Sequence, residues 1–278
     1  MKNHRLFIVL ILVFAAFAAS SFHTPVRPFN DGKIRTIVID AGHGGKDPGA
    51  LGIHSQEKQV TLAIALELEK TLKEHSPEIN VVLTRDDDKF IELSERAKQV
   101  AKSEADFFIS IHCNSNRNKE AYGSETYVLG THRTESNMDV VMRENAVIMM
   151  EDNYEEVYEG FDPNSVPAYI FFQYITNVHL EMSNKMAAKV QDQFATRVGR
   201  KDRGVKQAGY LVLWRASKPA ILIETGFISN KEEEIFLTSE NGRSYLSSAI
   251  YRAIRDYNAE MAGTDPASSG GNGTAAEH

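Results

Sequence analysis

Cysteine is almost absent from this sequence, since its 278 residues include only Cys113. A single cysteine excludes an internal disulfide, so a hydrophobic core must stabilise the chain. The 42% of hydrophobic residues suffice for one large domain or two small ones. An excess of basic residues is also lacking. The net charge of −7 argues against an extended nucleic-acid-binding surface.

Long apolar runs are lacking too, with one exception at the N-terminus. Leu6 to Ala19 is uninterrupted, follows Lys2 and Arg5, and ends among small residues suited to cleavage. We therefore expect residues 1–24 to be a secretory signal peptide. An uncleaved anchor ranks second because a membrane helix requires roughly 20 apolar residues. The mature chain is then exported to the periplasm or cell envelope, with no stable membrane span after cleavage.

The C-terminal residues 263–278 have the opposite composition. They are small, polar and rich in glycine and serine, and they cannot bury enough apolar surface to fold. We expect a flexible tail there and a single folded domain over residues 33–262.

Within residues 33–262, strand and helix patterns alternate. Apolar runs predict strands at 34–40, 79–84, 106–112, 123–129, 211–213 and 220–224. Helical spacing predicts helices at 57–74, 93–102, 180–198, 232–237 and 243–261, with Arg96 and Lys98 pointing outward. Repeated alternation of this kind predicts an α/β fold with a mostly parallel, twisted sheet flanked by helices on both faces.

Residues 131–178, called the insertion below, interrupt this alternation. They contain one expected helix at 137–152 and then an acidic, aromatic stretch. A connection of this length is either functional or disordered, and its aromatic side chains suggest that it packs on the domain.

Four polar residues stand where strands end or a helix begins. His43 follows the first strand in a glycine-rich loop, Glu57 opens the first helix, His112 ends the third strand, and Glu224 ends the last strand. Parallel strands bring such residues to one edge of a sheet. Two histidines and one carboxylate are a typical set for hydrolytic zinc, whose fourth position holds water. A second carboxylate, here Glu224, is then needed to move the proton of that water.

Each of these residues also has an ordinary structural interpretation. A histidine after a strand is commonly a hydrogen-bonded loop residue, Glu57 could complement a helix dipole, and Glu224 could form a buried ion pair. Together, however, the four favour a metal site. His54, His75, His132 and His179 lack such settings and are expected at the surface. Cys113 follows His112 on a strand, so it should point into the core.

Several ordered motifs give the chain a strong resemblance to a known family. These are IVIDAGHGGKDPGALG, the helix start at Glu57, LTR at 83–85, SERA at 94–97, FISIHCNSN and PAILIETGFISN. Over about residues 34–261 the chain resembles the zinc-dependent N-acetylmuramoyl-L-alanine amidases of the Amidase_3 family, which have a phosphorylase/hydrolase-like α/β fold. The resemblance implies Zn²⁺ bound by His43, Glu57 and His112, and a catalytic Glu224. It also implies peptidoglycan as the substrate, with stem peptides released from muramic acid.

The sequence leaves the roles of several other residues open. Arg85 matches a family arginine and has either a structural role or a substrate-binding one. Asn114 could orient ligands or substrate, and Asp40 could hydrogen-bond a ligand histidine. Cys113 departs from the family's usual small residue, and Trp214 and Arg215 are not expected from the family pattern.

The insertion lies where cell-division amidases of this family carry a regulatory segment with a helix that blocks the zinc. The fragment MRENAVIMMEDNY resembles that segment. One hypothesis is therefore autoinhibition by Glu144 or Glu151, released by an activator protein that binds the insertion. The alternative is a wall of the substrate groove.

Two rival functions remain at this point. One is a zinc carboxypeptidase or endopeptidase acting on stem peptides, in which Arg85 or Arg96 would hold a terminal carboxylate. The other is a non-catalytic wall-binding protein with a degenerate site.

Overall fold

The computed structural model describes residues 31–131, 135–173 and 178–264. Its described residues from Gly32 onward form one compact unit. The expected signal peptide, all but the first two residues of the expected tail, and His132 lie outside the described residues. Among the described helices, none combines the length and apolar character required to cross a bilayer.

The described strands form a six-stranded sheet in the order β2-β1-β3-β6-β4-β5. Its strands are β1 (Thr36–Ala41), β2 (Asn80–Leu83), β3 (Phe107–Asn114), β4 (Ser124–Leu129), β5 (Asp202–Ala208) and β6 (Ala220–Phe227). Strand β1 pairs in parallel with β2 and β3, and β3 pairs in parallel with β6. Strand β4 is antiparallel to β6 and parallel to β5. The predicted α/β fold with a mostly parallel sheet is confirmed.

Strand β3 shows why the apolar runs that predicted strands do not alternate with polar residues. All eight of its residues are buried. Phe107, Ile109, Ile111 and Cys113 belong to one hydrophobic core, whereas Phe108 belongs to a second core on the other face of the sheet. A sheet covered on both faces requires such continuous apolar strands. Cys113 points into the core as predicted.

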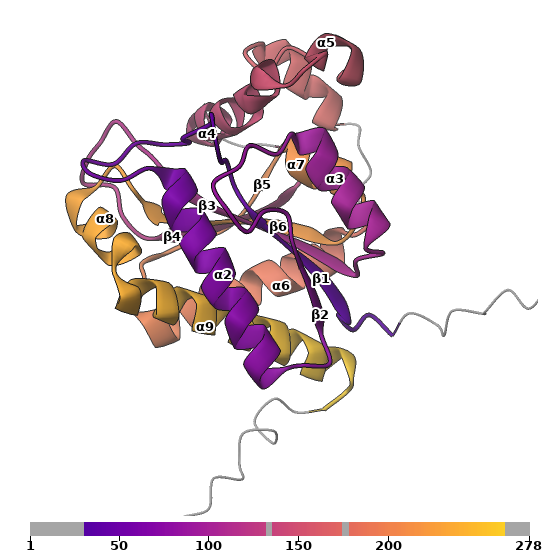
Figure 1. Cartoon of the computed structure of the whole chain (residues 1–278), viewed down its shortest axis with the longest axis vertical. Coiled ribbons are helices and arrows are strands. Elements are labelled where there is room, and N and C mark those ends of the chain that lie inside the picture. The colour runs from indigo at the N-terminus through magenta and orange to yellow at the C-terminus, as the bar shows by residue number, and fades with distance from the viewer. Residues whose placement is uncertain (1–30, 132–134, 174–177, 265–278) are drawn as a thin grey trace, which may run out of the picture. The chain divides into compact units, whose positions relative to one another are not determined.

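Two layers of helices cover the sheet. Figure 1 shows α2 (Glu57–His75), α6 (Leu180–Gln193) and α9 (Glu240–Met261) on one face, where their apolar side chains form the first core. Helix α8 (Lys231–Thr238) precedes α9, and a π-helical turn, η3 (Phe194–Val198), follows α6. Helices α3 (Leu93–Lys102) and α7 (Leu211–Ala216) cover the other face. This arrangement leaves the ends of β1, β3 and β6 to carry polar residues.

One sequence prediction near this part of the sheet is wrong, and one strand was missed. The apolar run at 211–213 begins helix α7, because a short apolar run does not distinguish a strand from a buried helical turn. The edge strand β5 was missed because its sequence, DRGVKQA, is mostly polar and partly exposed.

The expected outward direction of Arg96 is also wrong, since this side chain is only 2% exposed. Its guanidinium turns inward to pair with the buried carboxylate of Asp40. Helical spacing alone did not reveal this buried partner.

The insertion folds as short helical segments. They are α4 (Glu135–Asn145), the 3-10 helix η1 (Ala146–Met150), α5 (Tyr154–Val157) and the 3-10 helix η2 (Val166–Gln173). The expected single helix at 137–152 is therefore wrong, because regular α-helix ends at Asn145. Figure 1 shows these segments together at one end of the unit, next to α7.

Candidate metal centre

His43 lies in the loop that follows β1. Its backbone φ is 63°, in the left-handed region that residues with a side chain seldom adopt. Its Nδ1 donates to Asp47 Oδ2 at 2.7 Å, which orients the ring and leaves Nε2 facing the pocket. The prediction from the sequence that Asp40 hydrogen-bonds a ligand histidine is wrong. Asp40 accepts hydrogen bonds from Arg96, Thr84 and Ser110 instead.

The orienting carboxylate was thus missed by sequence reasoning. The available signal was the spacing in GHGGKDPG, where Asp47 follows His43 by four residues in the same loop.

Glu57 is the first residue of α2 and is fully buried. Its Oε2 accepts from the Ala50 amide at 2.7 Å, and its Oε1 accepts from the Cys113 amide at 2.8 Å. Burial raises the pKa of Glu57, but the charge of His43 and the hydrogen bond from His112 outweigh it, so the pKa falls to about 2. Glu57 is therefore a fixed, ionised donor.

His112 lies on β3, opposite Glu224 on β6. Its ring packs directly on the backbone of Gly42, where a Cβ would lie 2.4 Å from His112 Nε2. Only glycine therefore permits this approach. Burial lowers the pKa of His112, but the carboxylates of Glu144 and Glu57 outweigh it and raise the pKa to about 9.

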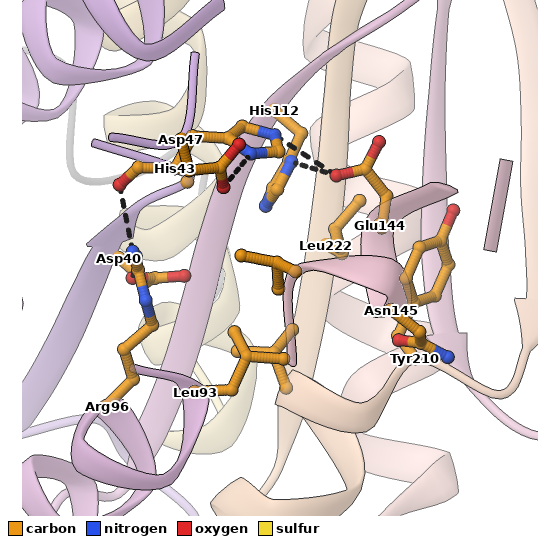
Figure 2. A pocket seen from close by; sticks show the side chains of 13 residues that line it. Asp40, His43, Asp47, Leu93, Arg96, His112, Glu144, Asn145, Tyr210 and Leu222 are labelled. Carbon is orange, nitrogen blue, oxygen red and sulfur yellow. Dashed lines mark hydrogen bonds and ion pairs between the residues drawn. The ribbon is translucent and has the colours of Figure 1, made fainter. Parts of the chain in front are cut away.

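A fourth donor comes from the insertion, because Glu144 near the end of α4 points at both histidines (Figure 2). Its Oε2 lies 3.1 Å from His43 Nε2 and 3.1 Å from His112 Nδ1. Glu57 Oε1 lies at the same distance from the same two nitrogens. The four donor atoms all lie within 4.8 Å of one another.

These distances fit a shared metal ion. Tetrahedral ligands about 2.0 Å from zinc are separated by roughly 3.3 Å. His43 Nε2 and Glu144 Oε2 are also buried without a hydrogen bond, so their closeness is not explained by mutual hydrogen bonding. Two carboxylates and two imidazoles that converge in this way offer a donor set of the kind that binds a metal ion. The cluster can therefore hold a metal ion.

The negative charge of Glu144 is balanced by its neighbour Arg143. Arg143 Nε and Nη2 lie 2.9 and 2.8 Å from Glu144 Oε1. Burial raises the pKa of Glu144, but the charges of Arg143 and the two histidines hold it well below its usual value. The other candidate, Glu151, lies elsewhere and accepts from the Leu93 amide at 2.6 Å and the Tyr158 hydroxyl at 2.8 Å.

Glu224 is fully buried, and neither of its carboxylate oxygens has a hydrogen-bond partner in the structure. Burial, followed by the charge of Glu144, raises its pKa well above the usual value. The β-sheet register places it between His112 on β3 and Glu125 on β4. A carboxyl group in this position can hold and deliver a proton.

The two remaining sequence candidates lie outside this cluster. Arg85 is buried and donates to the backbone carbonyls of Ala41 and Gly42. Asn114 donates to Glu125 and accepts from the Ser115 amide. Their side chains thus bind neighbouring backbone and side-chain groups and do not face the four converging donors.

Comparisons with known proteins agree with this geometry. Residues 37–256 match the Amidase_3 family, described as N-acetylmuramoyl-L-alanine amidase. Over 241 residues the chain is 31% identical to N-acetylmuramoyl-L-alanine amidase AmiA of Escherichia coli, covering 86% of this chain and 81% of that protein.

Solved structures give the same result. The catalytic domain of the amidase CwlV from Paenibacillus polymyxa is 31% identical, with a TM-score of 0.59, and the match covers 80% of this chain and 97% of that one. The CwlD amidase of Clostridioides difficile, solved in complex with the GerS lipoprotein, is 26% identical, with a TM-score of 0.57 and coverage of 80% and 98%. With its motifs, sheet topology and site geometry in agreement, this chain belongs to the Amidase_3 family of N-acetylmuramoyl-L-alanine amidases.

Proposed function

We propose that this chain is a zinc enzyme that hydrolyses the amide bond between N-acetylmuramic acid and L-alanine in peptidoglycan and releases stem peptides. It would act after export, in the periplasm or cell envelope. The observation that carries this proposal is the convergence of His43, Glu57 and His112, in a chain of this family, at a point beside the unpartnered carboxyl group of Glu224.

The donor set suits zinc. Two imidazole nitrogens and one carboxylate are the ligands of many hydrolytic zinc sites. When bound, the ion supplies a Lewis acid that polarises the scissile carbonyl and makes water more acidic. Asp47 holds His43 in the tautomer whose Nε2 is free to bind, and two backbone amides fix the carboxylate of Glu57.

Glu224 is proposed as the acid and base. It would accept a proton from the attacking water and deliver it to the leaving L-alanine nitrogen. Its dry surroundings favour the protonated form, which helps the delivery step. Displacement of Glu144 removes a neighbouring negative charge and so shifts the pKa of Glu224 toward the range in which it can also accept.

We further propose that the structure represents an inhibited state. With Glu144 in place, four protein donors surround the metal position, as in structural zinc sites, whereas catalytic sites keep one position for water. Of the two glutamates named from the sequence, we assign the blocking role to Glu144, because its Oε2 lies 3.1 Å from a nitrogen of each histidine. A partner protein that binds the insertion would draw Glu144 away. The solved complex of the CwlD amidase with a lipoprotein supports the idea that this chain also has a protein partner.

The rival functions have less support. A carboxypeptidase needs a cation for a terminal carboxylate, but Arg85 and Arg96 are both buried and bonded to the backbone of the His43 loop. A purely wall-binding protein has no need for a buried catalytic carboxyl group beside four converging donors.

The test is digestion of purified peptidoglycan by the mature chain with zinc, analysed by mass spectrometry. It should be repeated with the Glu144→Ala variant and with a short Gly-Ser linker in place of residues 131–178. We expect free stem peptides with N-terminal L-alanine, and at least tenfold more of them from the two altered proteins. Glu155→Ala, an exposed glutamate of the same insertion, is the matched control and should behave as wild type.

The outcomes are distinct. Shortened stems still attached to glycan would establish a carboxypeptidase instead. Amidase products that do not increase in either altered protein would overturn autoinhibition but keep the enzyme. Absence of products from all forms, with zinc bound, would overturn the amidase proposal for this chain.

A further inference from the structure

We infer that Arg85 and Arg96 are positioning residues for the metal ligand His43. Their side chains hold the three consecutive peptide carbonyls of residues 41–43, which fixes the direction of the His43 imidazole. This inference rests on the metal function proposed above, but it concerns residues that do not touch the metal position.

Arg96 reaches the loop from helix α3. Its Nη1 donates to the Ala41 carbonyl at 2.9 Å, and its Nη2 donates to the His43 carbonyl at 2.8 Å. The same Nη1 contacts Asp40 Oδ1 at 2.5 Å, so the charge is balanced within the core. Figure 2 shows Arg96 bonded to the His43 backbone on the side away from Glu144.

Arg85 reaches the same loop from the end of β2. Its Nε donates to the Ala41 carbonyl at 2.9 Å, and its Nη2 donates to the Gly42 carbonyl at 2.9 Å. Nη2 also donates to the Lys58 carbonyl at 2.8 Å, in the first turn of α2 next to Glu57. Arg85 therefore connects the backbone that carries His43 with the backbone that carries Glu57.

The loop needs such support for a physical reason. After β1 the regular sheet pairing ends, yet the loop remains buried, and buried carbonyls require partners. His43 also adopts a left-handed backbone, which persists only where the surroundings over-determine it. A guanidinium offers several donors in a rigid planar fork, so one arginine can fix two successive peptide planes. Lysine, a single point charge, cannot reproduce this pattern.

The experiment compares Arg96→Lys with its parent, both carrying Glu144→Ala so that three ligands determine binding. Zinc affinity is measured by competition with a chromogenic chelator. The geometry is read from the visible absorption spectrum of the Co²⁺-substituted protein. We expect Arg96→Lys to weaken zinc binding by about 10- to 100-fold, as loss of an outer partner of a metal ligand commonly does, and to alter the cobalt spectrum. Lys98→Gln, an exposed change on the same helix, is the control and should alter neither.

Unchanged affinity and an unchanged cobalt spectrum, with only a lower melting temperature, would show a merely structural role and overturn the inference. Should Arg96→Lys fail to fold, Arg85→Lys gives the second test, since it leaves the pair of Asp40 and Arg96 intact. Failure of both variants to fold would assign the arginines to the stability of the whole domain and would equally overturn it. A parent that binds no zinc would instead refute the proposed function itself.

Discussion

The donors that come from the sheet and the donor that comes from the insertion are held in different ways. His43 is hydrogen-bonded to Asp47, and Glu57 accepts from two backbone amides within the buried end of the sheet. Glu144 belongs to a segment in which α5 has no buried residue, and in which Met149 and Val166 are 50% and 55% exposed. His43 and Glu57 are therefore fixed at the end of the sheet, whereas Glu144 lies on a segment that buries Val141 and Ile148 in the second core but leaves other apolar residues exposed.

Polar contacts attach the insertion to the domain, in addition to the apolar packing of Val141, Ile148 and Tyr158 in the second core. Asn145 donates to the Gly209 carbonyl and accepts from the Leu211 amide, at the start of α7. Glu151 accepts from the Leu93 amide at the start of α3, and Arg215 donates to the Val157 carbonyl. Polar contacts can be exchanged for hydrogen bonds to water or to a partner, whereas the apolar side chains lose the stabilisation of burial when they are exposed.

Changes to residues held at the end of the sheet should lower activity or zinc binding, whereas changes that loosen the insertion should raise activity. The largest effect is expected for Glu224. Glu224→Gln keeps the shape of the side chain but cannot transfer a proton. We expect stem-peptide release to fall by about a hundred- to ten-thousand-fold, in both the wild-type and Glu144→Ala backgrounds. Zinc content measured on the same samples should be unchanged. Near-normal turnover with full zinc would remove Glu224 from the mechanism.

The next largest effect is expected from loss of the Asp47 carboxylate, which orients His43. Asp47→Asn removes the charged partner of His43 Nδ1 and should weaken zinc binding by about 10- to 100-fold, measured by chelator competition. Asp88→Asn is the matched control because Asp88 bonds the Gly45 amide in the same loop but does not contact His43. Equal effects of the two changes would mean that the loop as a whole, and not the histidine, had been disturbed.

On the insertion side, Asn145→Ala should activate. The change leaves the Leu211 amide and the Gly209 carbonyl without their partner, which destabilises the attached position by about 1–2 kcal/mol. The open fraction, and with it basal activity, should rise about five- to thirtyfold. Asp152→Asn, an exposed side chain nearby, should leave activity unchanged. A fall in activity after Asn145→Ala would indicate that the insertion forms part of the substrate groove.

The smallest effect expected is a difference in melting temperature on removal of the metal. Chelation should destabilise both wild type and Glu144→Ala, because an ion bound only by the folded state stabilises it. The decrease should be larger by a few degrees in wild type, in which a fourth donor contributes to binding. Equal decreases would show that Glu144 does not contact the ion.

The sequence predicted the sheet and the meeting of His43, Glu57 and His112 because both depend on local patterns. Apolar runs identify buried strands, and parallel strands place their ends together. The direction of Arg96 could not be predicted in this way. Its burial depends on Asp40 and on the carbonyls of a loop more than fifty residues earlier in the chain.

The choice between Glu144 and Glu151 was likewise beyond sequence patterns. The two would lie on the same side of one continuous helix, since seven residues make about two turns. The regular helix ends at Asn145, and the chain then continues as the 3-10 helix η1, so the two side chains face different surroundings. Such breaks depend on tertiary contacts like those of Asn145 with α7.

The position of Glu144 has a further consequence, which follows from thermodynamic reciprocity. If Glu144 strengthens metal binding, then bound metal must strengthen the docking of the insertion by the same free energy. The ion needed for hydrolysis is then also the ion that keeps the resting enzyme closed. A rise in available zinc would load the enzyme without switching it on, whereas metal-free chains would have the more easily displaced insertion and the greater exposure to proteolysis.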